Sequence, residues 1–208
     1  MSDKIVQLAE FKSKTKDKRI KMLFLIIIIA IILALLTWHY AIDNADLSAI
    51  KIPESRNVTY NSKPISAVTT MQIANEFNIS DDKPVLLYIY TSWCNICVKN
   101  FPIFNEIARE FQSTDLRVIA IAIDRETTTQ ELEKYLNNYG NVYFETKYLA
   151  NKEGFIEFLK KKGVSYNKMI PFTVLFSPKG EVVLKYVGVK SKEKLRRAVI
   201  QQLYLKND

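Results

Sequence analysis

The sequence is poor in metal-ligating side chains, with only two cysteines and one histidine among 208 residues. A structural zinc site uses about four ligands, and His39 lies beside an apolar segment, far along the chain from the cysteines. These three residues are too few for such a site, so we expect no bound metal. The chain also lacks a Met- or His-rich segment that would support copper binding by the two cysteines.

Dense basic runs are also scarce, although the net charge is +8. Residues 1–21 contain seven Lys/Arg and three Asp/Glu and therefore carry +4, while the other +4 is spread over 187 residues. The run Lys160–Lys162 ends a predicted helix, and positive charges at a helix C-terminus interact favourably with the helix dipole. We therefore expect no nucleic-acid partner. The chain has no internal repeat or low-complexity region, and its length fits one domain with an extension.

Long apolar runs are limited to one, at residues 22–42. Fifteen apolar residues from Met22 to Leu36 continue to Ile42, about the thickness of a bilayer, with Trp38 and Tyr40 placed as an aromatic belt. The run is long for the core of a cleaved signal peptide, and no small-x-small cleavage site follows it. We predict a single-pass anchor in the lipid bilayer. Because the basic residues 1–21 precede it, this tail is cytoplasmic and the rest lies outside the cytoplasm.

The two cysteines occur together, in Trp93-Cys94-Asn95-Ile96-Cys97. The motif follows an apolar run at 84–90, typical of a buried strand, and precedes a helical pattern at 98–111. A Cys-x-x-Cys motif between a strand and a helix is typical of a redox site. The helix N-terminus would stabilise the Cys94 thiolate, and Cys97, one turn later, could close a disulfide. The alternative is a pair of buried cysteines that only pack in the core.

We expect residues 43–62 to form a tether and residues 63–208 to form one domain. Strands are predicted over 65–69, 84–90, 116–123, 142–144, 172–176 and 181–187, and helices over 70–77, 98–111, 128–139, 151–162 and 191–205. Thr128 and Glu131 would form a capping box, and Pro102 should kink its helix. Because strands and helices alternate before a closing hairpin, the fold class is three-layer α/β/α with a mixed sheet.

From about residue 60 onward the chain resembles the thioredoxin-fold proteins. The matching features are Lys83–Leu87 leading into the Cys-x-x-Cys motif, Pro102 in the following helix, Ile170-Pro171-x-Thr173 as a cis-proline loop, Gly180 in the hairpin turn and Gly188 before the last helix. The anchor and the long section Asp124–Asn167 resemble the membrane-tethered TlpA/ResA-type thiol–disulfide oxidoreductases.

The resemblance implies that Cys94 attacks, Cys97 resolves, and Trp93, Ile170 and Pro171 contact the client, with the disulfide as the only redox group. Its partners would be protein thiols or disulfides and a membrane electron donor or acceptor. The domain would lie on the periplasmic side of the inner membrane. The resemblance favours a reductase, for example in cytochrome c maturation. An oxidase, an isomerase or a non-catalytic client-binding module are the alternatives.

The chain departs from the family at Tyr88, where thioredoxin has a buried aspartate. The dipeptide between the cysteines, Asn95-Ile96, contains neither the proline nor the glutamate of some relatives. No acid near the motif is evident in the sequence to take a proton from Cys97. Water, or an acid that the fold brings in, would have to serve.

Overall fold

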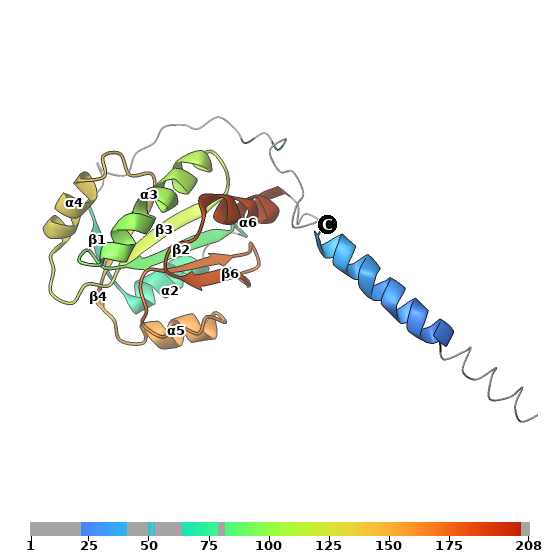
Figure 1. Cartoon of the computed structure of the whole chain (residues 1–208). Helices are drawn as coiled ribbons and strands as arrows, with labels where there is room; N and C mark the ends of the chain where they lie inside the picture. Colours follow the sequence, from blue (N-terminus) through green and yellow to red (C-terminus); the bar gives the residue numbers. More distant parts are fainter. Residues whose placement is uncertain (1–21, 41–49, 51, 53–63, 79–81, 205–208) are drawn as a thin grey trace, which may run out of the picture. The chain divides into compact units, whose positions relative to one another are not determined.

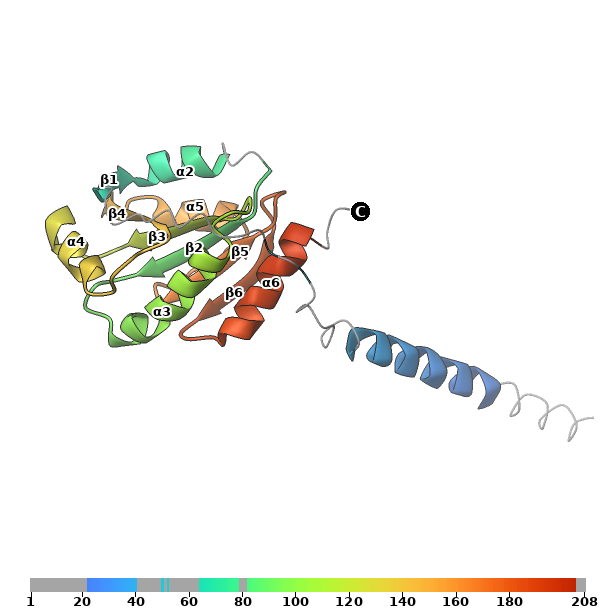
Figure 2. The ribbon, with the colours of Figure 1, turned by 90° about the horizontal axis from the view of Figure 1, so that it is seen from above.

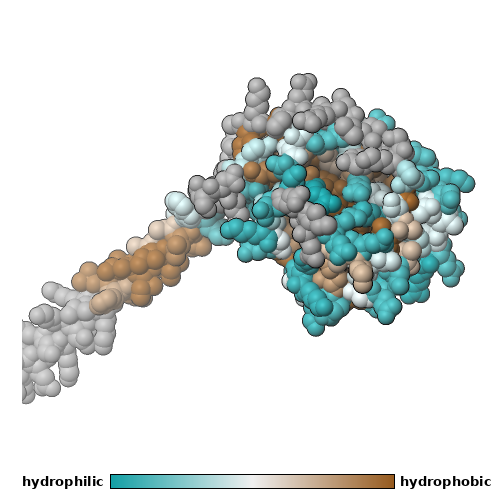
Figure 3. Space-filling model, turned by 180° about the vertical axis from the view of Figure 1, so that it is seen from behind, coloured by the Kyte–Doolittle hydropathy of each residue, from teal (hydrophilic) through white to brown (hydrophobic). Residues whose placement is uncertain are grey.

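The computed structural model describes residues 22–40, 50, 52, 64–78 and 82–204, and the chain divides into two units, 1–49 and 50–208. The described part of the first unit is one helix, Met22–Tyr40, which by length and composition could cross a membrane. Figure 3 shows its surface as mainly hydrophobic. The predicted basic tail, the last two residues of the predicted span and most of the predicted tether lie outside the described residues.

The second unit is built on one mixed sheet of six strands in the order β1-β4-β3-β2-β5-β6. The strands are β1 (Ser66–Thr69), β2 (Val85–Tyr90), β3 (Arg117–Ala122), β4 (Glu145–Asn151), β5 (Phe172–Phe176) and β6 (Val182–Val187). β1, β4, β3 and β2 run parallel to their neighbours, whereas β5 is antiparallel to β2 and β6 to β5. The closing hairpin therefore forms the antiparallel edge that the sequence predicts.

Helices cover both faces of this sheet (Figures 1 and 2). They are α2 (Thr70–Asn78), α3 (Asn95–Glu110), α4 (Thr129–Asn137), α5 (Phe155–Lys161) and α6 (Lys192–Tyr204). α2 and α5 lie on one face, and α3, α4 and α6 on the other. The predicted three-layer α/β/α class is confirmed, as is the capping box of α4 between Thr128 and Glu131.

The central strand β2 is buried along its whole length because helices cover both of its faces. Leu87 and Ile89 belong to the apolar core that β2 shares with α2 and α5. Tyr88 and Tyr90 point to the other face, where the Tyr88 ring stacks on Phe104 of α3 with 4.7 Å between ring centroids. This packing fixes the end of β2 that leads to the cysteines.

The predicted strand at 142–144 is wrong, because the strand begins at Glu145 and runs to Asn151. Val142 and Phe144 are buried, but they lie in the connection before the strand. The strand itself contains Lys147, which is 6% exposed. Its amine lies 2.8 Å from Glu76 and 3.0 Å from Glu145. These ion pairs allow a charged residue to occupy a buried strand position.

The helix predicted from 151 begins four residues later, at Phe155. Asn151 ends β4, and Gly154 precedes the helix with a φ of +73°. This left-handed conformation favours glycine and is incompatible with a continuous helix from Asn151. The helix ends at Lys161, close to the predicted end.

Candidate active site

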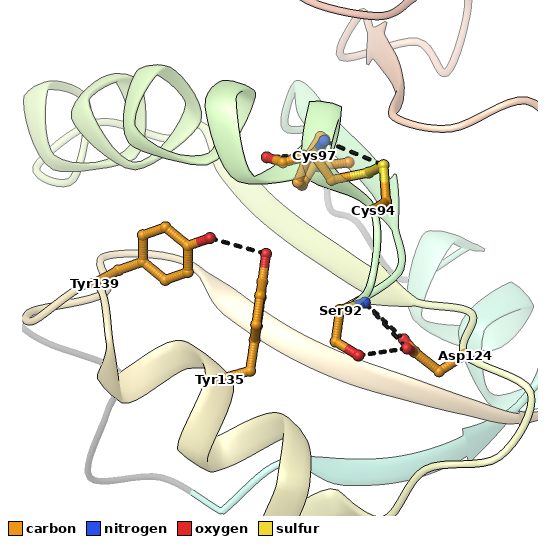
Figure 4. Close-up of a disulfide and its surroundings, with 7 residues drawn as sticks. Ser92, Cys94, Cys97, Asp124, Tyr135 and Tyr139 are labelled. Atoms are coloured by element: carbon orange, nitrogen blue, oxygen red, sulfur yellow. Dashed lines mark hydrogen bonds between the residues drawn. A yellow bond between two sulfur atoms is a disulfide. The ribbon is translucent and has the colours of Figure 1, made fainter.

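Cys94 and Cys97 form a disulfide at the start of α3, with 5.2 Å between their Cα atoms (Figure 4). Cys94 is the N-cap residue of α3, and the backbone N–H of Cys97 donates to the Cys94 sulfur over 3.1 Å. The positive end of the helix dipole therefore acts on this sulfur, which favours its thiolate form. Cys94 is 7% exposed and Cys97 is fully buried.

Tyr88 lies beneath the disulfide, on β2. Its hydroxyl donates to the backbone carbonyl oxygen of Cys97 over 3.1 Å, and its side chain is fully buried. Burial raises the pKa of Tyr88 well above its ordinary value. The hydroxyl is therefore a neutral donor that holds the first turn of α3 against the sheet, and not a carboxylate like that of thioredoxin.

Asn100 lies three residues after Cys97 on α3 and is 1% exposed. Neither polar atom of its amide has a hydrogen-bond partner within the described part of the chain. The amide is close enough to Tyr88 to oppose, in part, the increase in the pKa of Tyr88 that burial causes. Sequence reasoning missed Asn100, although the three-residue spacing already placed it on the Cys97 face of the helix.

The fold brings one acid to the cysteine loop, Asp124, which follows β3 and is 2% exposed. The backbone N–H of Ser92 donates to the two carboxylate oxygens over 3.0 and 3.2 Å, and the Ser92 hydroxyl donates over 2.6 Å (Figure 4). The Lys152 amine donates to the Asp124 backbone oxygen over 2.5 Å. Asp124 thus fixes the loop two residues before Cys94. Sequence reasoning did not assign it, although carboxyl ends of adjacent parallel strands meet at one sheet edge.

The remaining predicted site residues lie at the same end of the sheet. The Ile170–Pro171 peptide bond is cis, as predicted. The next residue, Phe172, pairs with Ile89 near the end of β2 that leads to the cysteines. Trp93, which is 71% exposed, and Ile170 line one cavity. Within the described ranges, no three His, Cys, Asp or Glu side chains are grouped to hold a metal.

Known proteins share this architecture. Two curated relatives, the thiol-disulfide oxidoreductases ResA of Bacillus thuringiensis (strain Al Hakam) and Bacillus anthracis, are each 26% identical over 113 residues, which are 54% of this chain. The chain spans only 60% of the length of these relatives. The crystal structure of a thioredoxin-family thiol:disulfide interchange protein from Chlorobium tepidum TLS matches with a TM-score of 0.51 at 20% identity, over 60% of this chain and 82% of that one.

The structural match shows the thioredoxin-like fold, in agreement with the resemblance found in the sequence. The AhpC/TSA family matches residues 67–202. This range includes the cysteine motif and, apart from Ser66, the whole sheet. This match covers well over half of the chain, and the chain therefore belongs to the AhpC/TSA family.

Proposed function

We propose that this chain is a thiol–disulfide oxidoreductase that works through Cys94 and Cys97. The observation that carries the proposal is the disulfide at the N-terminus of α3, with Cys94 as the cap. A helix N-terminus is one of the environments that lower the pKa of a cysteine and make it nucleophilic. The names of the two ResA relatives state this activity and support the proposal.

In the proposed reaction, the Cys94 thiolate attacks one sulfur of a client disulfide, and the other client sulfur leaves with the electron pair of the broken bond. Cys97 then loses its proton and attacks Cys94 in the mixed disulfide. The bond between Cys94 and the client breaks, and the client sulfur takes up a proton. The client is reduced and the Cys94–Cys97 disulfide forms. Trp93, Ile170 and Pro171 contact the client beside the sulfurs.

The proposal places this reaction outside the cytoplasm. Residues 22–42 anchor the protein in the inner membrane, residues 1–21 are cytoplasmic, and a tether at 43–62 leads to the domain at 63–208. The apolar helix and the basic residues before it support this arrangement. The resemblance to TlpA/ResA-type proteins supports a reductase, with cytochrome c maturation as one setting. Because each turnover consumes two electrons, a membrane donor must reduce the disulfide again.

An insulin-reduction assay on the full chain in detergent tests the activity. The reduced protein should precipitate the insulin B chain faster than a Cys94→Ser, Cys97→Ser double variant in the presence of excess dithiol. A thiol titration should show two protein thiols lost for each client disulfide reduced. Equal rates for the two proteins, with no loss of protein thiols, would contradict the proposal and favour a non-catalytic client-binding module.

A further inference from the structure

A cavity of about 830 Å³ lies next to the loop that leads to Cys94, where Thr91 and Trp93 line it. Four segments line it: the cysteine loop with Trp93, residues 123–126 after β3, the stretch from Lys152 to Ile156, and residues 166–170 before the cis proline. Its volume lies within the usual range for ligand pockets, about 300–1,000 Å³. Because Trp93 precedes Cys94 and Ile170 precedes the cis proline, a client held at the sulfurs would extend into this cavity.

The cavity carries a net positive charge. Arg125, Lys152 and Lys168 line it, and none of the three forms an ion pair within the described part of the chain. Asp124 and Glu126 also line the cavity, so its three cations exceed its two acids by one charge.

Lys152 and Arg125 also lie close enough to interact with each other. Desolvation lowers the pKa of Lys152, the charge of Asp124 opposes this, and the positive charge of Arg125 lowers the pKa further. Two cations that repel each other in a cavity would both be stabilised by an anion placed near them. The charges therefore favour a negatively charged occupant.

The rest of the lining is mostly apolar and partly open to solvent. Trp93 is 71% exposed and Ile156 is 40% exposed. Ile123 and Ile170 add further apolar surface to the lining. Exposed aromatic and aliphatic side chains of this kind supply the contact area that anchors a peptide. An occupant that matches the cavity has both an apolar side chain and a carboxylate.

We propose that this cavity binds a client segment that carries Asp or Glu, together with an apolar side chain, within a few residues of its reactive cysteine. This inference rests on the proposed function, because it names the class of client on which Cys94 acts. Carboxylate binding by Arg125 and Lys168 positions the client disulfide at Cys94, and a basic segment is repelled from the same position.

The test uses the full chain, reduced, in detergent. Three synthetic peptides each carry one cysteine joined by a disulfide to a chromogenic aromatic thiol, and they differ only in having Glu, Gln or Lys two residues from that cysteine. We expect the Glu peptide to react about tenfold faster than the Lys peptide at low ionic strength, with Gln between them. About 0.5 M salt should reduce this ratio, because it screens exposed charges.

Charge reversal identifies the residues responsible. Arg125→Glu with Lys168→Glu should invert the preference, so that the Lys peptide reacts faster. Lys179→Glu with Lys185→Glu is the matched control, because it changes the net charge equally on exposed positions of the β5–β6 hairpin, and it should keep the preference for Glu. Equal rates for all peptides, or an unchanged preference after reversal, would overturn this inference and leave the oxidoreductase function standing. If no peptide reacts, both proposals are wrong.

Discussion

The two buried polar side chains next to Cys97, those of Tyr88 and Asn100, carry no charge. By the resemblance to thioredoxin, Tyr88 corresponds to the buried acid of that protein, and its hydroxyl donates to the Cys97 carbonyl oxygen. Asn100, one turn along the helix, adds a buried amide without a partner among the described residues. In the proposed reaction, Cys97 would therefore act in a local environment that hydrogen-bonds and positions it, without a carboxylate directly behind it.

The Tyr88 hydroxyl should make a measurable contribution to stability. Tyr88→Phe removes one buried hydrogen bond and leaves the shape of the side chain unchanged, so we expect the free energy of unfolding to fall by about 1 kcal/mol. The measurement is urea denaturation of the oxidised full chain in detergent, followed by tryptophan fluorescence.

A matched control is available at Tyr166, whose buried hydroxyl has no hydrogen-bond partner within the described residues. Tyr166→Phe removes an unsatisfied polar group and should leave stability unchanged or slightly higher. Equal losses in the two variants would show that the bond from Tyr88 to Cys97 adds nothing of its own.

Between elements, the contact of Asp124 with Ser92 joins the end of β3 to the cysteine loop. Asp124→Ala removes the acceptor of three hydrogen bonds. A hydrogen bond to a charged group contributes a net of about 1.5–3 kcal/mol. The three bonds come from two donors of one residue and are not independent, so we expect a total loss of about 2–4 kcal/mol in unfolding free energy. Ser92→Ala removes only the hydroxyl donor and should cost about 1.5–2 kcal/mol, at the low end of the range for a bond to a charged group.

A double-mutant cycle separates this contact from general damage to the core. The effects of Asp124→Ala and Ser92→Ala should be less than additive, since both remove the same hydroxyl–carboxylate bond. The rate at which iodoacetamide alkylates reduced Cys94 should also change in Asp124→Ala, because the loop sets the position of the sulfur. Strict additivity, with an unchanged alkylation rate, would contradict a positioning role for Asp124.

Elements with a strong pattern were predictable from the sequence. The apolar run of β2 and the capping box of α4 carry local signals that tertiary contacts do not override. β4 was misplaced because its buried Lys147 depends on ion pairs with Glu76 and Glu145, and Glu76 is distant in the sequence. Hydropathy alone cannot detect such compensation.

In the candidate site, too, some features follow from local sequence patterns and others depend on contacts between distant segments. The cysteine motif and the cis proline are short sequence patterns, and the sequence predicted both. Asp124 lies 32 residues from Ser92, and the cavity combines four separate segments. These features form only when the fold brings distant segments together at one edge of the sheet. Sequence reasoning could therefore predict the cysteine pair and the cis bond but not the residues that hold and surround them.

For the whole molecule, the central topological prediction is an anchored domain outside the cytoplasm. Protease added to intact spheroplasts should digest the domain and leave a small fragment that contains the apolar helix, because the basic residues 1–21 keep the N-terminus in the cytoplasm. The measurement is an immunoblot against an N-terminal tag. Protection in intact spheroplasts, with digestion only after lysis, would reverse the orientation.

The most direct test of the account is the difference between the two cysteines in trapping clients. Cys97→Ser should accumulate mixed disulfides with client proteins, because Cys94 at the N-cap still attacks and no second thiol resolves the adduct. Cys94→Ser should trap few clients, because Cys97 is fully buried. Non-reducing gels of both variants, expressed as full chains and quenched with acid, give the measurement. More adducts on Cys94→Ser would reverse the assigned roles, and no adducts on either variant would contradict disulfide exchange at this site.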